Sequence, residues 1–131
     1  MVMTLIQIMF FIHLAAPPSN SGVIFASEVF RPYKTIIHAI GATETRHDTL
    51  AYNPIEQATG YFQIRPIRLL DFNQRTGSDY KMQDLYSYEI SEKIFLYYAT
   101  QFRHDDYRGI AYEWNKSVTD RYWKKVKAQL N

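Results

Sequence analysis

The stretch SEVFRPYKTIIHAIGATET, residues 27–45, determines the fold that we predict for this chain. Its apolar side chains recur at spacings of three and four, the pattern of a helix with one buried stripe. Pro32 suits the first turn of such a helix, where a missing N–H needs no partner. The stripe runs into Glu44, so we expect a helix that ends with a carboxyl group beside the core. The apolar positions are Val29, Tyr33, Ile36, Ile37 and Ile40.

Two helices are predicted in the middle of the chain. Pro66 begins a short one with Ile67 and Leu70 facing inward, and Gly77 ends it. A long helix follows over residues 83–103, because apolar side chains continue there with helical spacing. The side chains that support it are Met82, Leu85, Tyr88, Phe95, Tyr98 and Phe102.

Two further helices are predicted near the C-terminus, over residues 107–114 and 118–130. Ser117 and Asp120 have the spacing of a capping pair for the last one, whose inner row comprises Val118, Tyr122, Val126 and Leu130. The segment 49–63 carries turn signals and room for short extended pieces. The sequence therefore predicts a mainly α domain of five to six helices, with an irregular central segment that can hold a small β-hairpin.

Composition indicates one folded domain and excludes several kinds of chemistry. With 131 residues, 47% of them apolar, the chain can build one core and has little room for a second domain. The absence of cysteine excludes disulfides, thiol nucleophiles and cysteine-bound metal. A net charge of +2 is too small to indicate a nucleic-acid partner.

No pattern in the sequence indicates a metal or a cofactor. His47-Asp48 and His104-Asp105-Asp106 lack a recognised ligand spacing, so we interpret them as solvated loop residues. The sequence also contains neither a glycine-rich phosphate loop nor a nucleophile elbow. We expect neither a metal nor a cofactor.

Residues 1–26 differ in character from the domain that we assign to residues 27–131. The run MVMTLIQIMFFIHLAA, residues 1–16, is mostly apolar and carries no charged residue. It resembles the apolar region of a secretory signal, although no Lys or Arg precedes Arg31. Export or membrane contact through residues 1–16 is the first interpretation. A mispredicted start, or an apolar arm that packs in an assembly, are the others.

Three short segments carry the candidate chemistry. They are AIGATET at 39–45, GYFQI at 60–64 and IAYEWN at 110–115, and Glu44 lies 19 residues before Gln63 and 71 before Asn115. In this order and spacing they resemble the lytic transglycosylase branch of the lysozyme superfamily, over roughly residues 28 to 130. The runs AYNP at 51–54 and FQIRP at 62–66 look like phage and Bacteroidetes-type members.

The resemblance implies a peptidoglycan-cleaving enzyme in which Glu44 is the acid and base. Such a reaction needs a proton donor whose pKa is raised toward neutrality, and a Glu at the end of an apolar helix suits that task. The alternative for Glu44 is a solvated carboxylate at a helix end. The sequence departs from the family at three places: Thr45 replaces the usual Ser, Tyr61-Phe62 replaces Leu-Met, and Lys116-Ser117 replaces Gly-Gly.

The other candidate site residues are assigned to substrate binding. Gly60 allows a tight turn close to a ligand, and the amide of Gln63 can both donate and accept toward an amino sugar. Two of these residues also have a structural alternative. Gln63 could tie the loop to the core, and Trp114 could pack in the core. The full set is Thr45, Gly60, Tyr61, Phe62, Gln63, Tyr112, Trp114 and Asn115.

Three functions remain open from the sequence. The first is a lytic transglycosylase that uses a single Glu and forms a 1,6-anhydro product from the MurNAc-GlcNAc bond, as the resemblance implies. The second is a hydrolytic muramidase, for which Asp48 or Glu56 would be the second carboxylate. The third is a non-catalytic wall-binding or virion structural protein. We expect peptidoglycan strands as the partner, a monomer unless the chain joins a virion or secretion assembly, and an exported or phage-associated location.

Overall fold

Helices make up most of the described chain, which comprises residues 31–116 and 119–131 of the computed structural model. A two-stranded antiparallel sheet interrupts them, with Tyr52 paired to Thr59 and Asn53 to Ala58. This confirms the mainly α fold with a small hairpin in the central segment. The elements are η1 Arg31–Tyr33, α3 Lys34–Thr45, β1 Tyr52–Asn53, β2 Ala58–Thr59, α4 Pro66–Thr76, η2 Met82–Tyr86, α5 Tyr88–Ala99, α6 Tyr107–Trp114 and α7 Thr119–Lys127.

Helix α3 buries the stripe that the sequence predicts. Ile36 and Ile40 are fully buried and Ile37 nearly so, whereas Val29 lies outside the described residues. The helix ends where Arg46 adopts the left-handed conformation, with φ 53°. Glu44 therefore lies in the last turn of α3, four residues after Ile40 and on the same face as the buried stripe.

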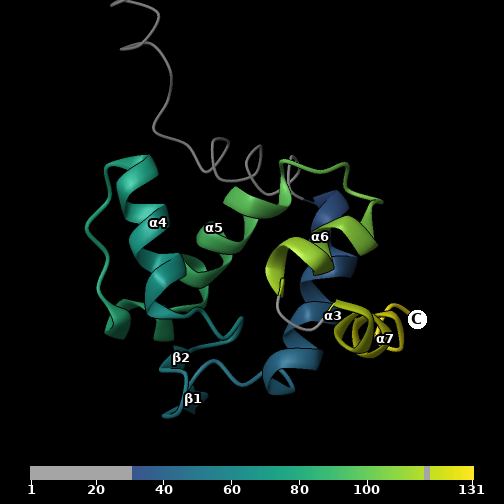
Figure 1. The fold of residues 1–131 in the computed structure, drawn as a ribbon, viewed down its shortest axis with the longest axis horizontal. Coiled ribbons are helices and arrows are strands. Elements are labelled where there is room, and N and C mark those ends of the chain that lie inside the picture. The colour runs from purple at the N-terminus through teal and green to yellow at the C-terminus, as the bar shows by residue number, and fades with distance from the viewer. Residues whose placement is uncertain (1–30, 117–118) are drawn as a thin grey trace, which may run out of the picture. The chain divides into compact units, whose positions relative to one another are not determined.

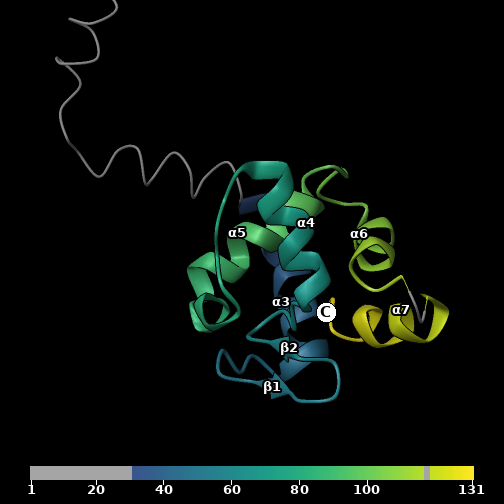
Figure 2. The same cartoon turned by 60° about the vertical axis from the view of Figure 1, so that its left-hand side comes forward.

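The other helices are arranged around this one. Helix α3 contacts both α6 and α7, and α6 in turn contacts α5. In both views α6 and α7 lie together to the right of α5, and the hairpin lies below the helices near the C-terminal end of α3 (Figures 1 and 2). The hairpin and the end of α3 thus meet at one edge of residues 32–131, which form one compact unit.

The predicted inner face of α4 is wrong. Ile67 and Leu70 are 71% and 52% exposed, whereas Leu69 and Phe72 are buried. Both pairs have a spacing of three, so spacing alone could not distinguish them. The core takes the pair that contains Phe72, because burying the larger aromatic ring removes more apolar surface from water.

The single long helix predicted over residues 83–103 is also wrong. The structure divides it into η2 and α5 at Ser87, whose backbone is extended (φ −74°, ψ 118°). The Ser87 hydroxyl accepts a hydrogen bond from the Ile90 N–H at 3.4 Å, so Ser87 serves as the N-cap of α5. Serine is favoured at the N-cap of a helix and is neutral to unfavourable in a helix interior, so a new helix begins after Ser87.

The two C-terminal helices follow the prediction more closely. Helix α6 has the predicted bounds, and α7 spans Thr119–Lys127 within the predicted range. Tyr122 and Val126 are buried, and Leu130 packs against the core. The capping pair that involves Ser117, the inner position Val118 and the apolar leader lie outside the described residues. Within the described part of the chain, no helix is long and apolar enough to cross a membrane.

Candidate active site

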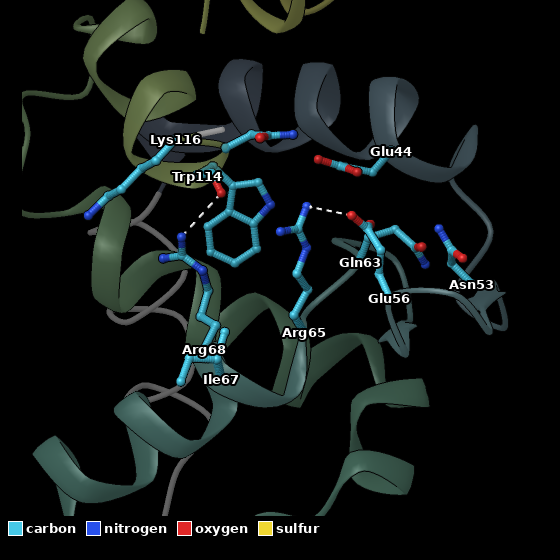
Figure 3. Close-up of a pocket in the computed structure, with 10 residues that line it drawn as sticks. Glu44, Asn53, Glu56, Gln63, Arg65, Ile67, Arg68, Trp114 and Lys116 are labelled. Carbon is cyan, nitrogen blue, oxygen red and sulfur yellow. Dashed lines mark hydrogen bonds and ion pairs between the residues drawn. The ribbon is translucent and has the colours of Figure 1, made fainter. Parts of the chain in front are cut away.

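A cleft of about 320 Å³ lies where the end of α3, the hairpin, the start of α4 and the end of α6 meet (Figure 3). Four of the site residues predicted from the sequence line it: Glu44, Gln63, Trp114 and Asn115. Folding therefore brings together side chains from all three segments that the resemblance rests on. The remaining lining residues are Asn53, Glu56, Arg65, Ile67, Arg68 and Lys116.

Glu44 is held by a residue of α7, the helix that packs against α3. The hydroxyl of Tyr122, in α7, donates to Glu44 Oε1 at 2.6 Å. Burial raises the pKa of Glu44 from its ordinary value of 4.5 to about 7, against the opposing effects of the Tyr122 hydrogen bond and the positive charges of Arg65 and Lys125. At neutral pH a large fraction of Glu44 therefore carries a proton and can act as an acid.

Thr45 joins the end of α3 to the turn that follows the hairpin. Its hydroxyl donates to the carbonyl of Tyr61 at 3.0 Å and lies 3.2 Å from the carbonyl of Gly41. Thr45 is not among the residues that line the cleft. In this structure its hydroxyl ties the end of α3 to the turn.

The turn at residues 60–63 depends on two left-handed backbone conformations. Gly60 has φ 79°, and a Cβ there would lie 2.2 Å from the carbonyl oxygen of Leu85, so glycine fits this position and alanine does not. Gln63 has φ 53°, and its amide nitrogen donates to the carbonyls of Gly60 at 3.1 Å and Ala51 at 3.4 Å. Gln63 thus ties the loop together while its side chain lines the cleft.

Tyr61 and Phe62 are buried and do not line the cleft. The Tyr61 ring packs onto α3 at Gly41, where an added Cβ would lie 2.1 Å from the ring. Phe62 is fully buried and stacks on Phe95 with ring centroids 4.6 Å apart. Both side chains, assigned to substrate binding from the sequence, form core that supports the turn.

Trp114 packs in the core and also borders the cleft. Its indole N–H donates to the carbonyl of Phe62 at 3.0 Å, and its ring packs edge-on against Phe95. The Arg68 guanidinium lies 4.5 Å from the Trp114 ring centroid. Although only 8% of Trp114 is exposed, it borders the cleft, as does the neighbouring Asn115, whose backbone N–H caps α6 by donating to Ala111 at 3.0 Å.

Tyr112 lies away from these residues. Its hydroxyl donates to Asp120 of α7 at 2.5 Å and accepts from Arg108 at 3.1 Å. It borders a separate shallow hollow next to Asp106 and Gly109. The structure does not bring Tyr112 to the cleft that holds Glu44.

Two charged residues line the cleft that were not among the predicted site residues. Arg65 had been assigned no role, and Glu56 only that of a possible second carboxylate. Arg65 and Glu56 form an ion pair, with 3.0 Å between guanidinium nitrogen and carboxylate oxygen (Figure 3). Glu56 was one of two candidates for a second carboxylate. The other, Asp48, does not line the cleft, and its carboxylate accepts from the backbone N–H of Leu50 at 2.9 Å. The FQIRP run contained Arg65, but nothing in its spacing indicated that its side chain lines the same cleft as Glu44.

Arg68 forms the boundary between the cleft and a second hollow of about 530 Å³. Its guanidinium donates to the carbonyls of Glu113 at 3.0 Å and Trp114 at 3.1 Å. The exposed side chains of Ile67 and Leu70 border the second hollow. These two side chains, predicted to face inward, point outward and shape the surface beside the candidate site.

The three histidines of the described chain, His38, His47 and His104, take part in ring contacts. His47 packs between His38 and Tyr61, with ring centroids 4.4 and 5.7 Å away, and His104 lies edge-on to Tyr33. Among the described residues, no group of three or more His, Asp or Glu side chains is placed to hold a metal ion.

Comparisons of the chain with protein-family models, with curated proteins and with solved structures gave no match.

Proposed function

We propose that this chain is a lytic transglycosylase that cleaves the β-1,4 bond between MurNAc and GlcNAc in peptidoglycan. The observation that carries this proposal is a carboxyl group, Glu44, with a pKa of about 7 in a cleft lined by Gln63, Trp114 and Asn115. A carboxylic acid that holds its proton near neutral pH is the group that glycosidic cleavage needs. The identity of the sugar rests on the resemblance of the three segments.

The chemistry requires only one group that moves protons. Protonated Glu44 gives its proton to the glycosidic oxygen as the bond from that oxygen to C1 of MurNAc breaks, and the GlcNAc unit leaves as an alcohol. The Glu44 carboxylate then takes the proton from the C6 hydroxyl of the same MurNAc while that oxygen bonds to C1. The products are a 1,6-anhydro sugar and a new GlcNAc end, and Glu44 is again protonated.

The other cleft residues suit an amino-sugar ligand. The amides of Gln63 and Asn115 can exchange hydrogen bonds with N-acetyl and hydroxyl groups, and Trp114 offers an apolar edge to a sugar ring. A wall-cleaving enzyme must also reach the wall. The apolar run at residues 1–16 supports export or membrane contact as part of the same proposal.

The test is mass spectrometry of the muropeptides that the full chain releases from purified peptidoglycan, with Glu44→Gln beside the wild type. We expect anhydro-muropeptides from the wild type and a loss of roughly 100-fold or more in the variant, the usual contribution of a general acid. Asp48→Asn is the matched control, because Asp48 is a nearby carboxylate that lies outside the cleft. No release by folded wild type would favour the non-catalytic binding protein.

One observation favours a second candidate, the hydrolytic muramidase. Glu56 lines the same cleft as Glu44, and hydrolytic glycosidases use a pair of carboxyl groups. In this case the products would carry reducing ends and would incorporate oxygen from labelled water. Glu56→Gln would then remove the activity as fully as Glu44→Gln.

A further inference from the structure

The Arg65–Glu56 ion pair spans two segments that border the cleft of Glu44. Glu56 belongs to the turn between β1 and β2, and Arg65 is the N-cap residue of α4. Their side chains are 45% and 41% exposed, so both are accessible to solvent within the cleft. Figure 3 shows the Arg65 guanidinium directed toward Glu56, with the Glu44 carboxylate on the other side of the same space.

Four groups on three elements act on the charge of Glu44. Tyr122 and Lys125 come from α7, Arg65 from the start of α4, and Glu56 from the hairpin turn. Tyr122 is fixed by its hydrogen bond and by burial. Arg65 is the cation whose position depends on a partner in the cleft, because its ion pair with Glu56 holds it at 3.0 Å. A guanidinium without this partner would be drawn to the Glu44 carboxylate and would favour its ionised form.

We infer that Glu56 is a positioning residue that holds the Arg65 guanidinium on the hairpin side of the cleft, so that Glu44 stays available as a proton donor. This inference rests on the proposed function for its meaning, since it concerns the acid of that reaction. The signs of the two charges agree with it. The negative charge of Glu56 raises the pKa of Glu44, and the positive charge of Arg65 lowers it.

The test measures the pKa of Glu44 directly, by NMR titration of the carboxyl carbon, in the full chain and in two variants. Glu56→Gln removes a negative charge and frees Arg65, so the Glu44 pKa should fall below its value of about 7. Arg65→Gln should raise it. Each shift should be about 0.5 unit, the size typical of half-exposed charges screened by solvent, and should shrink at high salt. The double variant should return close to the wild type, because it removes both charges.

The pH profile of kcat/KM should shift in the same direction as the Glu44 pKa in each variant. Activity is lost as pH rises through the Glu44 pKa, because the proton donor is lost. The alkaline limb should therefore move to lower pH in Glu56→Gln and to higher pH in Arg65→Gln. Asp105→Asn is the control, since it breaks the exposed Arg103–Asp105 pair of 2.9 Å outside the cleft and should shift nothing.

Two results would overturn the inference. One is a Glu44 pKa that is unchanged, or that moves in the same direction, in both variants. The other is loss of turnover at every pH in Glu56→Gln with an unchanged Glu44 titration, which would make Glu56 a catalytic residue. Because the NMR titration needs no activity, an inactive wild type would refute the proposed function while leaving this measurement decisive for the ion pair.

Discussion

The two walls of the cleft are built on different principles. The wall at the end of α3 is packed helix backed by α7: the Tyr122 hydroxyl of α7 donates to Glu44, and Val126 of the same helix is fully buried. The wall formed by residues 52–65 has strands of only two residues and positive φ angles at Gln57, Gly60 and Gln63. The helical wall sets the ionisation of the acid through burial. The loop wall places charges and amides through backbone conformations that few residues can adopt.

The strongest test of this contrast is Gly60→Ala in the loop wall. We expect a loss of about 4 kcal/mol in the free energy of unfolding, because the added Cβ would lie 2.2 Å from a rigid backbone carbonyl at φ 79°. Urea denaturation monitored by circular dichroism measures it. Gly77→Ala is the matched control: it has φ 69° with no atom within 4 Å of the added Cβ, so it should cost only about 1 kcal/mol. Equal losses in the two variants would show that the loop wall adapts to strain.

The helical wall should show a smaller effect that depends on pH. Glu44 has its pKa raised from 4.5 to about 7, so between these values the folded chain keeps a proton that the unfolded chain releases. Stability should therefore fall as pH rises from 4.5 to 7, by up to about 3 kcal/mol. Glu44→Gln, which has no proton to lose, should lack this fall.

Urea denaturation at pH 4 and pH 8 measures the difference. From pH 4 to pH 8 the free energy of unfolding of the variant should rise relative to that of the wild type. The difference also measures the stability cost of a buried acid. Asp48→Asn is the comparison, as its carboxylate lies at the exposed end of the same segment. A wild type whose decline between the two pH values matches that of Glu44→Gln would contradict the environment assigned to Glu44.

The same contrast explains what the sequence predicted and what it missed. The periodicity of α3, α6 and α7 predicted the helical wall, because regular burial leaves a regular pattern. Periodicity failed in α4, where the faces that contain Leu69 and Leu70 have equal spacing. It also failed at Ser87, which divides a continuous row of apolar residues into two helices. The choice of Glu44 as candidate acid came from the resemblance of the three segments, because spacing alone left a solvated carboxylate at a helix end as the alternative.

In the loop wall, the resemblance identified Gly60 and Gln63 but not the tie between Thr45 and Tyr61 or the pairing of Glu56 with Arg65. Those interactions join residues that no local period connects. The direction of each side chain follows from the turn conformations, which single positive φ angles set. Long-range ties of this kind become visible only after the chain has folded.

The bond between the two walls should give the smallest effect. Thr45→Val keeps the shape of the side chain but removes the donor to the Tyr61 carbonyl, 3.0 Å away. We expect a loss of about 1 kcal/mol in the free energy of unfolding, typical of one hydrogen bond. Thr45→Ser, which keeps the hydroxyl, should lose less.

Kinetics on peptidoglycan fragments should separate positioning from catalysis. In Thr45→Val, the KM should rise more than kcat falls, because the turn that carries Gln63 loosens while Glu44 keeps its bond to Tyr122. A fall in kcat alone, with KM and stability unchanged, would mean that Thr45 acts on the reacting atoms. The two walls would then share the chemistry, and the division between a carboxyl group held by helices and a loop that carries Gln63 would no longer stand.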